Sequence, residues 1–278
     1  MSWQARLDLQ YHRHLSGQTL LRHQHTGPLR IFKSLYPEGA GICHNVIVHP
    51  PGGLVQGDSL EIEVAVAQGA HALISTPGAT RFYRSTSGEL ARQQVRLQLE
   101  AGSRLEWLPL ETIAYDGCQA QNQVQVELAP GAELLAWDVV SLGLPAAALP
   151  FASGCLTQHW EWPGIWLERA CIAAEDKRLL CSPLGLAGQT ALGTLVLACG
   201  TPLTRLRREA LLEACRGLIE AHPLASRCGA TCPNDYMLVV RALASQVEPL
   251  MQLWQSLWAL LRREAWLLAD QPPRIWSV

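Results

Sequence analysis

The chain has 278 residues, of which 49% are hydrophobic and 17% are charged. This composition supplies enough apolar side chains for a sizeable core and excludes an intrinsically disordered protein. The 22 basic and 24 acidic side chains give a net charge of −2, so no overall positive field attracts nucleic acid. We therefore predict a folded globular protein that does not bind nucleic acid.

Three features of the sequence bear on its compartment. Residues 1–6 lack the apolar core of a secretory signal peptide. The apolar run 142–152 is too short to span a bilayer and is interrupted by Pro145 and Pro150. The nine cysteines are spread along the chain and do not resemble the disulfide framework of a small secreted domain. These features predict a soluble cytoplasmic protein, without a membrane partner, whose cysteines are reduced thiols.

Three strand–turn–strand units recur in the first half of the chain. Residues 60–66, 95–99 and 124–128 alternate apolar and polar side chains, which is the pattern of half-buried strands. A turn and a second apolar run follow each of them, and the turn glycines at 69, 102 and 131 are 33 and 29 residues apart. We predict an irregular layered architecture of stacked β-hairpins.

The remaining elements complete a mainly β fold class with a few helices, mostly C-terminal. Further strands are expected at 42–48, 156–162 and 192–199. Residues 203–222 and 250–268 carry apolar side chains at helical spacing and predict two helices. No low-complexity linker separates the β-rich part, about 1–200, from the helical part, about 203–268. We therefore expect residues 1–278 to form a single domain.

Two tryptophans, Trp254 and Trp258, lie one turn apart on the second predicted helix. An aromatic stripe of this kind either packs on a sheet or anchors a partner protein. Both interpretations stay open, and Trp254 and Trp258 are candidate partner-binding residues.

A stretch rich in glycine and proline, residues 27–58, surrounds Cys43, His44, His49 and Asp58. Glycine and proline specify loop conformations, and specified loops commonly carry function. The four side chains are possible metal ligands, although their spacing is not that of a dedicated zinc site. The alternative is structural, with the Asp58 carboxylate hydrogen-bonded within its own turn.

Motifs for nucleotide binding and hydrolysis fail in this sequence. Residues 27–34 resemble a phosphate-binding loop, but Phe32 stands where that loop requires glycine. The sequence also lacks the HExxH motif of zinc proteases and the GxSxG motif of serine hydrolases. Any nucleotide energy must therefore come from a partner.

Two glutamates, Glu106 and Glu111, bracket the apolar segment 107–110. A carboxylate buried in such a segment requires an ion pair, hydrogen bonds or a bound cation. Arg81, Arg84 or a transiently bound metal ion are the candidates for this role.

Six segments together resemble the urease accessory protein family UreD, which is called UreH in some organisms. In chain order they are GPLR at 27–30, LYPEG at 35–39, CH at 43–44, HPPGGLVQGD at 49–58, TPGATRFYRS at 76–85 and EWLPLETI at 106–113. The resemblance runs in order from about residue 27 to 170 and continues more weakly to 278. Arg81 departs from the lysine usual in the family, a change that keeps the positive charge but alters the donor geometry.

This resemblance implies a layered, strand-rich fold and a maturation factor without catalytic activity. UreD proteins bind urease apoprotein and, with UreF and the GTPase UreG, deliver nickel that is commonly supplied by the carrier UreE. A nickel passage through the protein is implied, with Ni²⁺ in transit and no tightly bound cofactor. The candidate metal-contacting residues are His44, His49, Asp58, Glu106, Glu111 and Glu168, and the other candidate lining residues are Thr80, Arg81 and Tyr83.

Two other functions remain open from the sequence. The first is a metal-dependent hydrolase built around His44, His49 and Asp58, which would need a stably bound metal with an open coordination position. The second is a purely structural adaptor through which no metal passes.

Overall fold

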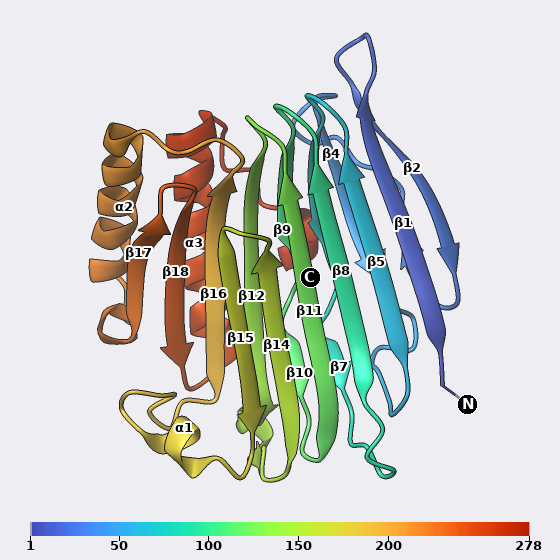
Figure 1. Ribbon diagram of the computed structural model, residues 1–278, viewed down its shortest axis with the longest axis vertical. Coiled ribbons are helices and arrows are strands. Elements are labelled where there is room, and N and C mark those ends of the chain that lie inside the picture. The colour runs from blue at the N-terminus through green and yellow to red at the C-terminus, as the bar shows by residue number, and fades with distance from the viewer. Residues whose placement is uncertain (1, 278) are drawn as a thin grey trace.

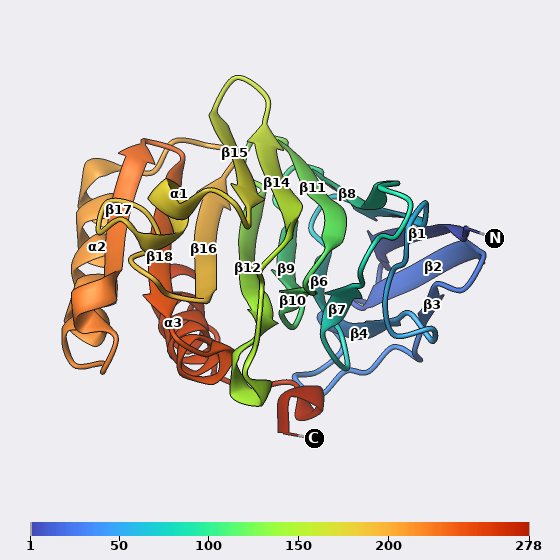
Figure 2. The ribbon, with the colours of Figure 1, turned by 90° about the horizontal axis from the view of Figure 1, so that it is seen from below.

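The computed structural model describes residues 2–277, which form two stacked β-sheets covered on one side by helices (Figure 1, Figure 2). The outer sheet has the strand order β15-β14-β11-β8-β5-β1-β2. Its strands are β1 (Gln4–Arg13), β2 (Thr19–Thr26), β5 (Ser59–Val66), β8 (Ala91–Leu99), β11 (Cys118–Leu128), β14 (Gly154–Trp162) and β15 (Trp166–Ala173).

The middle sheet has the strand order β17-β18-β16-β12-β9-β6-β4-β3. Its strands are β3 (Arg30–Ile31), β4 (Ile42–Val48), β6 (His71–Ser75), β9 (Arg104–Leu108), β12 (Glu133–Leu144), β16 (Ala191–Cys199), β17 (Cys228–Asn234) and β18 (Met237–Ala244). Three short strands, β7 (Thr80–Phe82), β10 (Thr112–Ala114) and β13 (Leu149–Pro150), extend it beside β12. The predicted strands at 42–48, 156–162 and 192–199 are confirmed as β4, β14 and β16.

The helical layer lies on the side of the middle sheet that points away from the outer sheet and covers the part formed by β12, β16, β18 and β17 (Figure 2). It consists of α2 (Arg205–Glu220) and α3 (Val247–Trp266), which confirm the two predicted helices. The shorter helices are α1 (Lys177–Cys181), η1 (Pro145–Ala147), η2 (Ala225–Arg227) and η3 (Arg274–Ser277). The side chain of Thr204 accepts a hydrogen bond from the backbone N–H of Arg207 at 3.3 Å and so caps the start of α2.

The repeated units confirm the mainly β, layered fold class but differ from hairpins in their pairing. The two strands of one unit, such as β5 and β6, lie in different sheets, and each pairs in parallel with the equivalent strand of the next unit. The parallel register reproduces the repeat, because Ile62 lies opposite Val95 and Val95 lies opposite Val124. Each turn therefore carries the chain from one sheet to the other, with Gly69 in the left-handed region at a φ of 69°.

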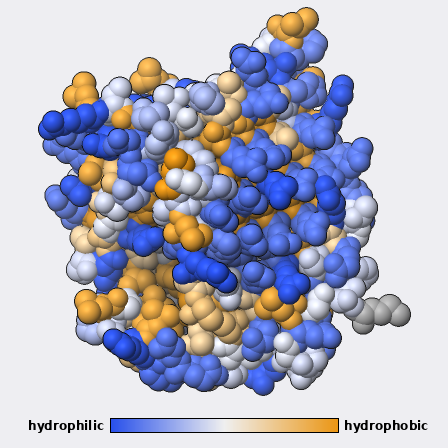
Figure 3. All heavy atoms as spheres, in the orientation of Figure 1, coloured by the Kyte–Doolittle hydropathy of each residue, from blue (hydrophilic) through white to orange (hydrophobic). Residues whose placement is uncertain are grey.

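The two sheets differ in how their faces are covered. Strands of the outer sheet alternate buried and exposed residues, and its outward face is largely hydrophilic (Figure 3). Central strands of the middle sheet are buried on both faces: in β12, Leu134 and Ala136 pack against the outer sheet while Leu135 and Trp137 pack against the helices. The middle sheet therefore separates two apolar layers, and a polar side chain within either layer needs hydrogen-bond or ion-pair partners.

Within residues 2–277, no helix is both long enough and apolar enough to cross a membrane.

Candidate functional site

A cavity of about 200 Å³ lies between the two sheets, lined by residues of β4 and β7 and by residues of β5, β8 and β9. Its lining includes three residues predicted from the sequence, His49, Thr80 and Arg81, together with Gln93 and Trp107. The Nε2 atom of His49 is buried and has no hydrogen-bond partner among residues 2–277. Burial lowers the pKa of His49, although the nearby Asp58 acts to raise it, so the site favours a neutral imidazole with a free nitrogen.

Other predicted residues near this cavity have structural roles. The buried Asp58 carboxylate accepts hydrogen bonds from the backbone N–H groups of Trp3 at 2.6 Å and Val55 at 2.9 Å. These contacts agree with the structural interpretation of Asp58, in which the carboxylate stabilises its own turn, rather than with a metal ligand. Glu111 accepts a hydrogen bond from the N–H of Thr80 at 2.9 Å through its main-chain carbonyl. The Tyr83 ring lies outside the cavity lining, 4.9 Å between centroids from the ring of Tyr115.

A row of polar side chains begins at the cavity and runs along the inner face of the outer sheet, and its last member contacts the middle sheet. Gln93 on β8, Asn122 on β11 and Gln158 on β14 are opposite one another in the parallel register. The Gln93 Nε2 donates to Asn122 Oδ1 at 3.3 Å, and the Gln158 Nε2 donates to Asp138 Oδ2 at 2.7 Å. We define Gln93, Asn122, Gln158 and Asp138 as the interior polar row.

The far end of the interior polar row holds two carboxylates. Asp138 on β12 has its pKa raised to about 7, chiefly by burial and then by the negative charge of Glu168. Glu168, a predicted site residue, also forms an ion pair with Arg241. The Oε1 atom of Gln158 has no partner within the described residues 2–277. This end of the row therefore gathers carboxylate and amide oxygen atoms, which are the ligands that hard divalent cations accept.

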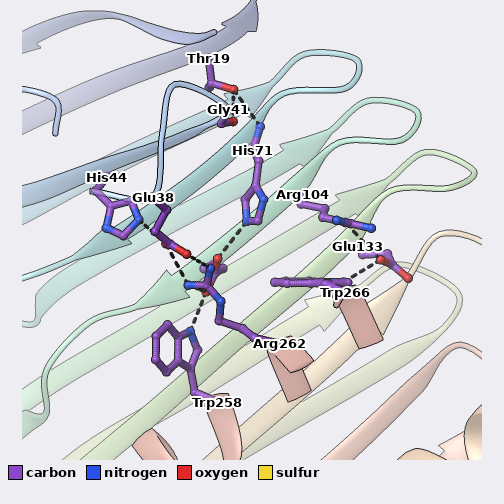
Figure 4. A network of polar contacts seen from close by, with 11 residues as sticks. Thr19, Glu38, Gly41, His44, His71, Arg104, Glu133, Trp258, Arg262 and Trp266 are labelled. Atoms are coloured by element: carbon purple, nitrogen blue, oxygen red, sulfur yellow. Dashed lines mark hydrogen bonds and ion pairs between the residues drawn. The ribbon is translucent and has the colours of Figure 1, made fainter. Parts of the chain in front are cut away.

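A second polar assembly, the α3 network, lies on the opposite face of the middle sheet (Figure 4). Glu106, 0% exposed, accepts hydrogen bonds from His71 Nε2 at 2.8 Å and from Trp258 Nε1 at 2.6 Å. The Nη1 of Arg262, also fully buried, lies 3.6 Å from a carboxylate oxygen of Glu106. Arg262 also forms an ion pair with Glu38.

The α3 network connects three distant parts of the chain. His44 on β4 contacts Glu38 through Nε2 at 2.8 Å, and Glu38 in turn contacts Arg262 on α3. Close by, Glu133 accepts a hydrogen bond from Trp266 Nε1 at 2.6 Å. Paired buried charges of this kind hold elements in place only while both partners are present. The network therefore fixes α3 on the middle sheet.

The predicted metal-contacting residues thus do not form one site. His49 faces the cavity, Glu168 lies at the far end of the interior polar row, and His44 and Glu106 belong to the α3 network. Side chains alternate along β4, so that Asn45 reaches Tyr11 of the outer sheet while His44 points to the other face. Among residues 2–277, no group of three or more His, Cys, Asp or Glu side chains is arranged to hold a metal ion. The geometry gives no support to a hydrolase site made of His44, His49 and Asp58.

The sequence profile described as "UreD urease accessory protein" matches residues 4–277 of this chain. The chain belongs to the UreD family. It is 58% identical to the urease accessory protein UreD of Albidiferax ferrireducens, and each chain is covered completely. It is 55% identical to UreD of a Polaromonas species and 53% identical to UreD of Variovorax paradoxus, again with 100% of each chain covered. The predicted family membership is therefore confirmed, and the family is named for an accessory protein.

The burial of the tryptophan pair in this UreD chain favours the first of the two interpretations left open by the sequence, packing on the sheet, over partner binding. Trp254 and Trp258 are 0% and 1% exposed and pack in the apolar layer between α3 and the middle sheet. Neither side chain is available at the surface to anchor a partner, because the stripe faces the sheet. The indole N–H of Trp258 instead donates a hydrogen bond to Glu106.

Sequence reasoning missed several polar residues of this UreD structure. Arg262 lies at the same spacing as the tryptophans, four residues after Trp258 and four before Trp266, which signals a cation on a buried helix face. Asp138 follows the buried Trp137 within an apolar run. Glu38 and His71 carry no comparable signal, because Arg262, the cation that meets Glu38, and Glu106, the partner of His71, are distant from them in sequence.

Proposed function

We propose that this chain is a urease maturation factor without catalytic activity of its own. In this proposal it binds urease apoprotein together with UreF and the GTPase UreG in the cytoplasm. It then provides a passage through which Ni²⁺, delivered indirectly from UreE, reaches the urease active site. Membership of the UreD family along nearly the whole chain supports the role in urease maturation. The interior polar row is the observation that supports the passage.

The chemistry of the interior polar row suits a cation in transit. Imidazole nitrogen and carboxylate or amide oxygen are ligands that divalent first-row metals accept. His49 offers the free nitrogen at the cavity, the amides of Gln93 and Asn122 follow, and Asp138 with Glu168 ends the path. Conduction requires sites that admit an ion and also release it. Spaced single ligands meet this requirement better than a closed coordination shell.

The other predicted residues take different places in the proposal. Thr80 and Arg81 belong to the cavity wall. Because the exposed Arg81 guanidinium repels Ni²⁺, its suitable role is to pair with an acidic group of a partner at the cavity mouth. His44 and Glu106 are already hydrogen-bonded within the α3 network, so the passage proposed here does not include them.

The proposal is tested by the nickel content of urease matured with variant chains. Asn122→Leu and Gln93→Leu replace inward amides by apolar side chains of similar size and should lower the nickel bound per urease. Gln123→Leu and Gln94→Leu are the matched controls, because these neighbouring amides point outward into solvent and should leave the nickel content unchanged.

Formation of the complex with UreF and urease must be measured in parallel. An inward variant that still forms the complex but yields nickel-poor urease supports a passage. Normal nickel content with both inward variants would contradict the passage and favour the structural adaptor. A stoichiometric metal retained by the isolated chain after chelation, together with turnover, would favour the hydrolase.

A further inference from the structure

Two cysteines face each other on the outward side of the β14–β15 hairpin. The Sγ atoms of Cys155 on β14 and Cys171 on β15 are 3.0 Å apart. Cys171 is exposed and Cys155 is half-buried, and both are free thiols. Neither belongs to the cavity, the interior polar row or the α3 network. The pair is therefore a chemical feature that the proposed function leaves unused.

The strand pairing explains why the two sulfur atoms meet. In the antiparallel register, Cys155 lies opposite Ala173 and Cys171 lies opposite Thr157. The two cysteines are diagonal neighbours on one face, a separation that side chains can bridge. Because β15 is the edge strand of the outer sheet, it can shift more easily than a strand that is paired on both sides. A further approach of about 1 Å gives the sulfur–sulfur distance of a disulfide.

We propose that Cys155 and Cys171 form an oxidisable dithiol that closes into a disulfide between β14 and β15. The oxidant is a low-molecular-weight disulfide of the glutathione class. The Cys171 thiolate attacks one sulfur of this oxidant, whose S–S bond breaks and releases one thiol. The Cys155 thiolate then attacks the Sγ of Cys171 in the mixed disulfide and releases the second thiol. Overall, two protein thiols are oxidised while one disulfide is reduced to two thiols.

The surroundings of the two sulfur atoms assign this order of attack. The exposed Cys171 can be reached by a dissolved disulfide, whereas Cys155 is partly covered. Burial, followed by the hydrogen bond with Cys171, raises the pKa of Cys155 to about 11. A thiol that ionises so poorly is a weak first nucleophile, but it can act as the resolving thiol because its target sulfur is adjacent.

Closure of this disulfide would restrict the motion of β15, the strand that carries Glu168. The bond would tie the edge strand β15 to β14 at one point of their register. Backbone amides of β15 should then exchange with solvent more slowly in the oxidised protein than in the reduced protein. This inference does not depend on the proposed function, because it concerns only the chemistry of the hairpin.

The test exposes the full-length chain, natively folded, to oxidised glutathione, blocks the remaining thiols with N-ethylmaleimide and maps the peptides by mass spectrometry. The wild-type chain should give a peptide pair linked through Cys155 and Cys171. Cys155→Ser should trap a glutathione adduct on Cys171, because the resolving thiol is missing. Cys171→Ser should give neither the linked peptides nor an adduct on Cys155.

Cys181→Ser is the matched control, since Cys181 is an exposed free cysteine on α1, and it should form the linked pair as the wild type does. A wild-type chain that accumulates the Cys171 adduct without linked peptides would overturn the proposal. Linkage of Cys155 to the neighbouring Cys118, or to several cysteines without preference, would overturn it equally.

Discussion

Replacement of Arg262 by methionine removes the only cation that contacts both carboxylates of the α3 network within residues 2–277. Arg262 is fully buried and lies between Glu38 and Glu106, whose side chains are 8% and 0% exposed. Methionine retains much of the apolar stem that packs on the Trp258 ring, 4.8 Å from the guanidinium carbon. The substitution therefore tests the charge more than the packing.

The expected cost follows from the groups that remain. Removal of one partner from a buried ion pair typically costs about 3–5 kcal/mol, because the other charge stays buried without compensation. Glu106 keeps its hydrogen bonds from His71 and Trp258, and Glu38 keeps its contact with His44. These remaining donors place the expected loss of stability near the lower limit, at about 3 kcal/mol.

Urea unfolding followed by tryptophan fluorescence measures this loss. Arg263→Met is the matched control, because Arg263 is 62% exposed and forms a surface ion pair with the neighbouring Glu264, a contact worth less than about 1 kcal/mol. Addition of Glu38→Gln and Glu106→Gln to Arg262→Met should recover part of the loss, since the two carboxylates that Arg262 contacts are then neutral amides. Equal stability of Arg262→Met and Arg263→Met would refute the view that the network holds α3 in place.

Two further predictions concern pH. Burial acts to raise the pKa of Glu38, but hydrogen bonds from His44 and Arg262 outweigh it and leave the pKa below its usual value of 4.5. The ionised carboxylate therefore stabilises the fold above pH 4.5, and this contribution is lost on acidification, so Glu38→Gln should lose less stability than the wild type as the pH falls below 4.5. Urea titrations in which both proteins lose the same stability would contradict this prediction. For Asp138 the sign is opposite: its pKa is raised from 3.8 to about 7, so ionisation weakens the fold as the pH rises through this range. A shift of this size corresponds to roughly 4 kcal/mol. Since Asp138 is only partly buried, we expect about half of this, so Asp138→Asn should gain on the order of 2 kcal/mol over the wild type on going from pH 4 to pH 8. A difference that does not vary with pH would contradict the assignment.

The sequence predicted the strands well because period-2 alternation reports directly which face of a strand is buried. It did not reveal that the two strands of each unit lie in different sheets. The sequence does contain a signal of this arrangement. The first strand of each unit alternates apolar and polar residues, whereas second strands such as 105–108 are nearly continuously apolar. Strands of one hairpin share the same two faces, so this difference indicates separate sheets, with the second run covered on both sides.

The candidate site was predictable only in part. The sequence showed that Glu106 lies in an apolar segment and needs a partner, and the structure confirms that it is buried. The partners considered for it, Arg81 and Arg84, lie elsewhere, and Arg84 pairs with Asp116. The actual partners come from β6 and from α3, more than 150 residues later in the case of Trp258. Contacts of this range depend on the tertiary fold and have no local sequence signal.

The two polar assemblies differ in a way that separates a structural role from a binding role. In the α3 network, the carboxylates of Glu38 and Glu106 each meet a buried cation and a ring N–H donor, so a further cation would gain little there. In the interior polar row, Asp138 faces a second carboxylate, and an oxygen of Gln158 has no partner among residues 2–277. Burial and the nearby charge of Glu168 raise the pKa of Asp138, and in the proposed function a passing cation would stabilise its ionised form. The middle sheet thus separates the ion pairs that fix α3 from the carboxylates on which the proposed passage depends.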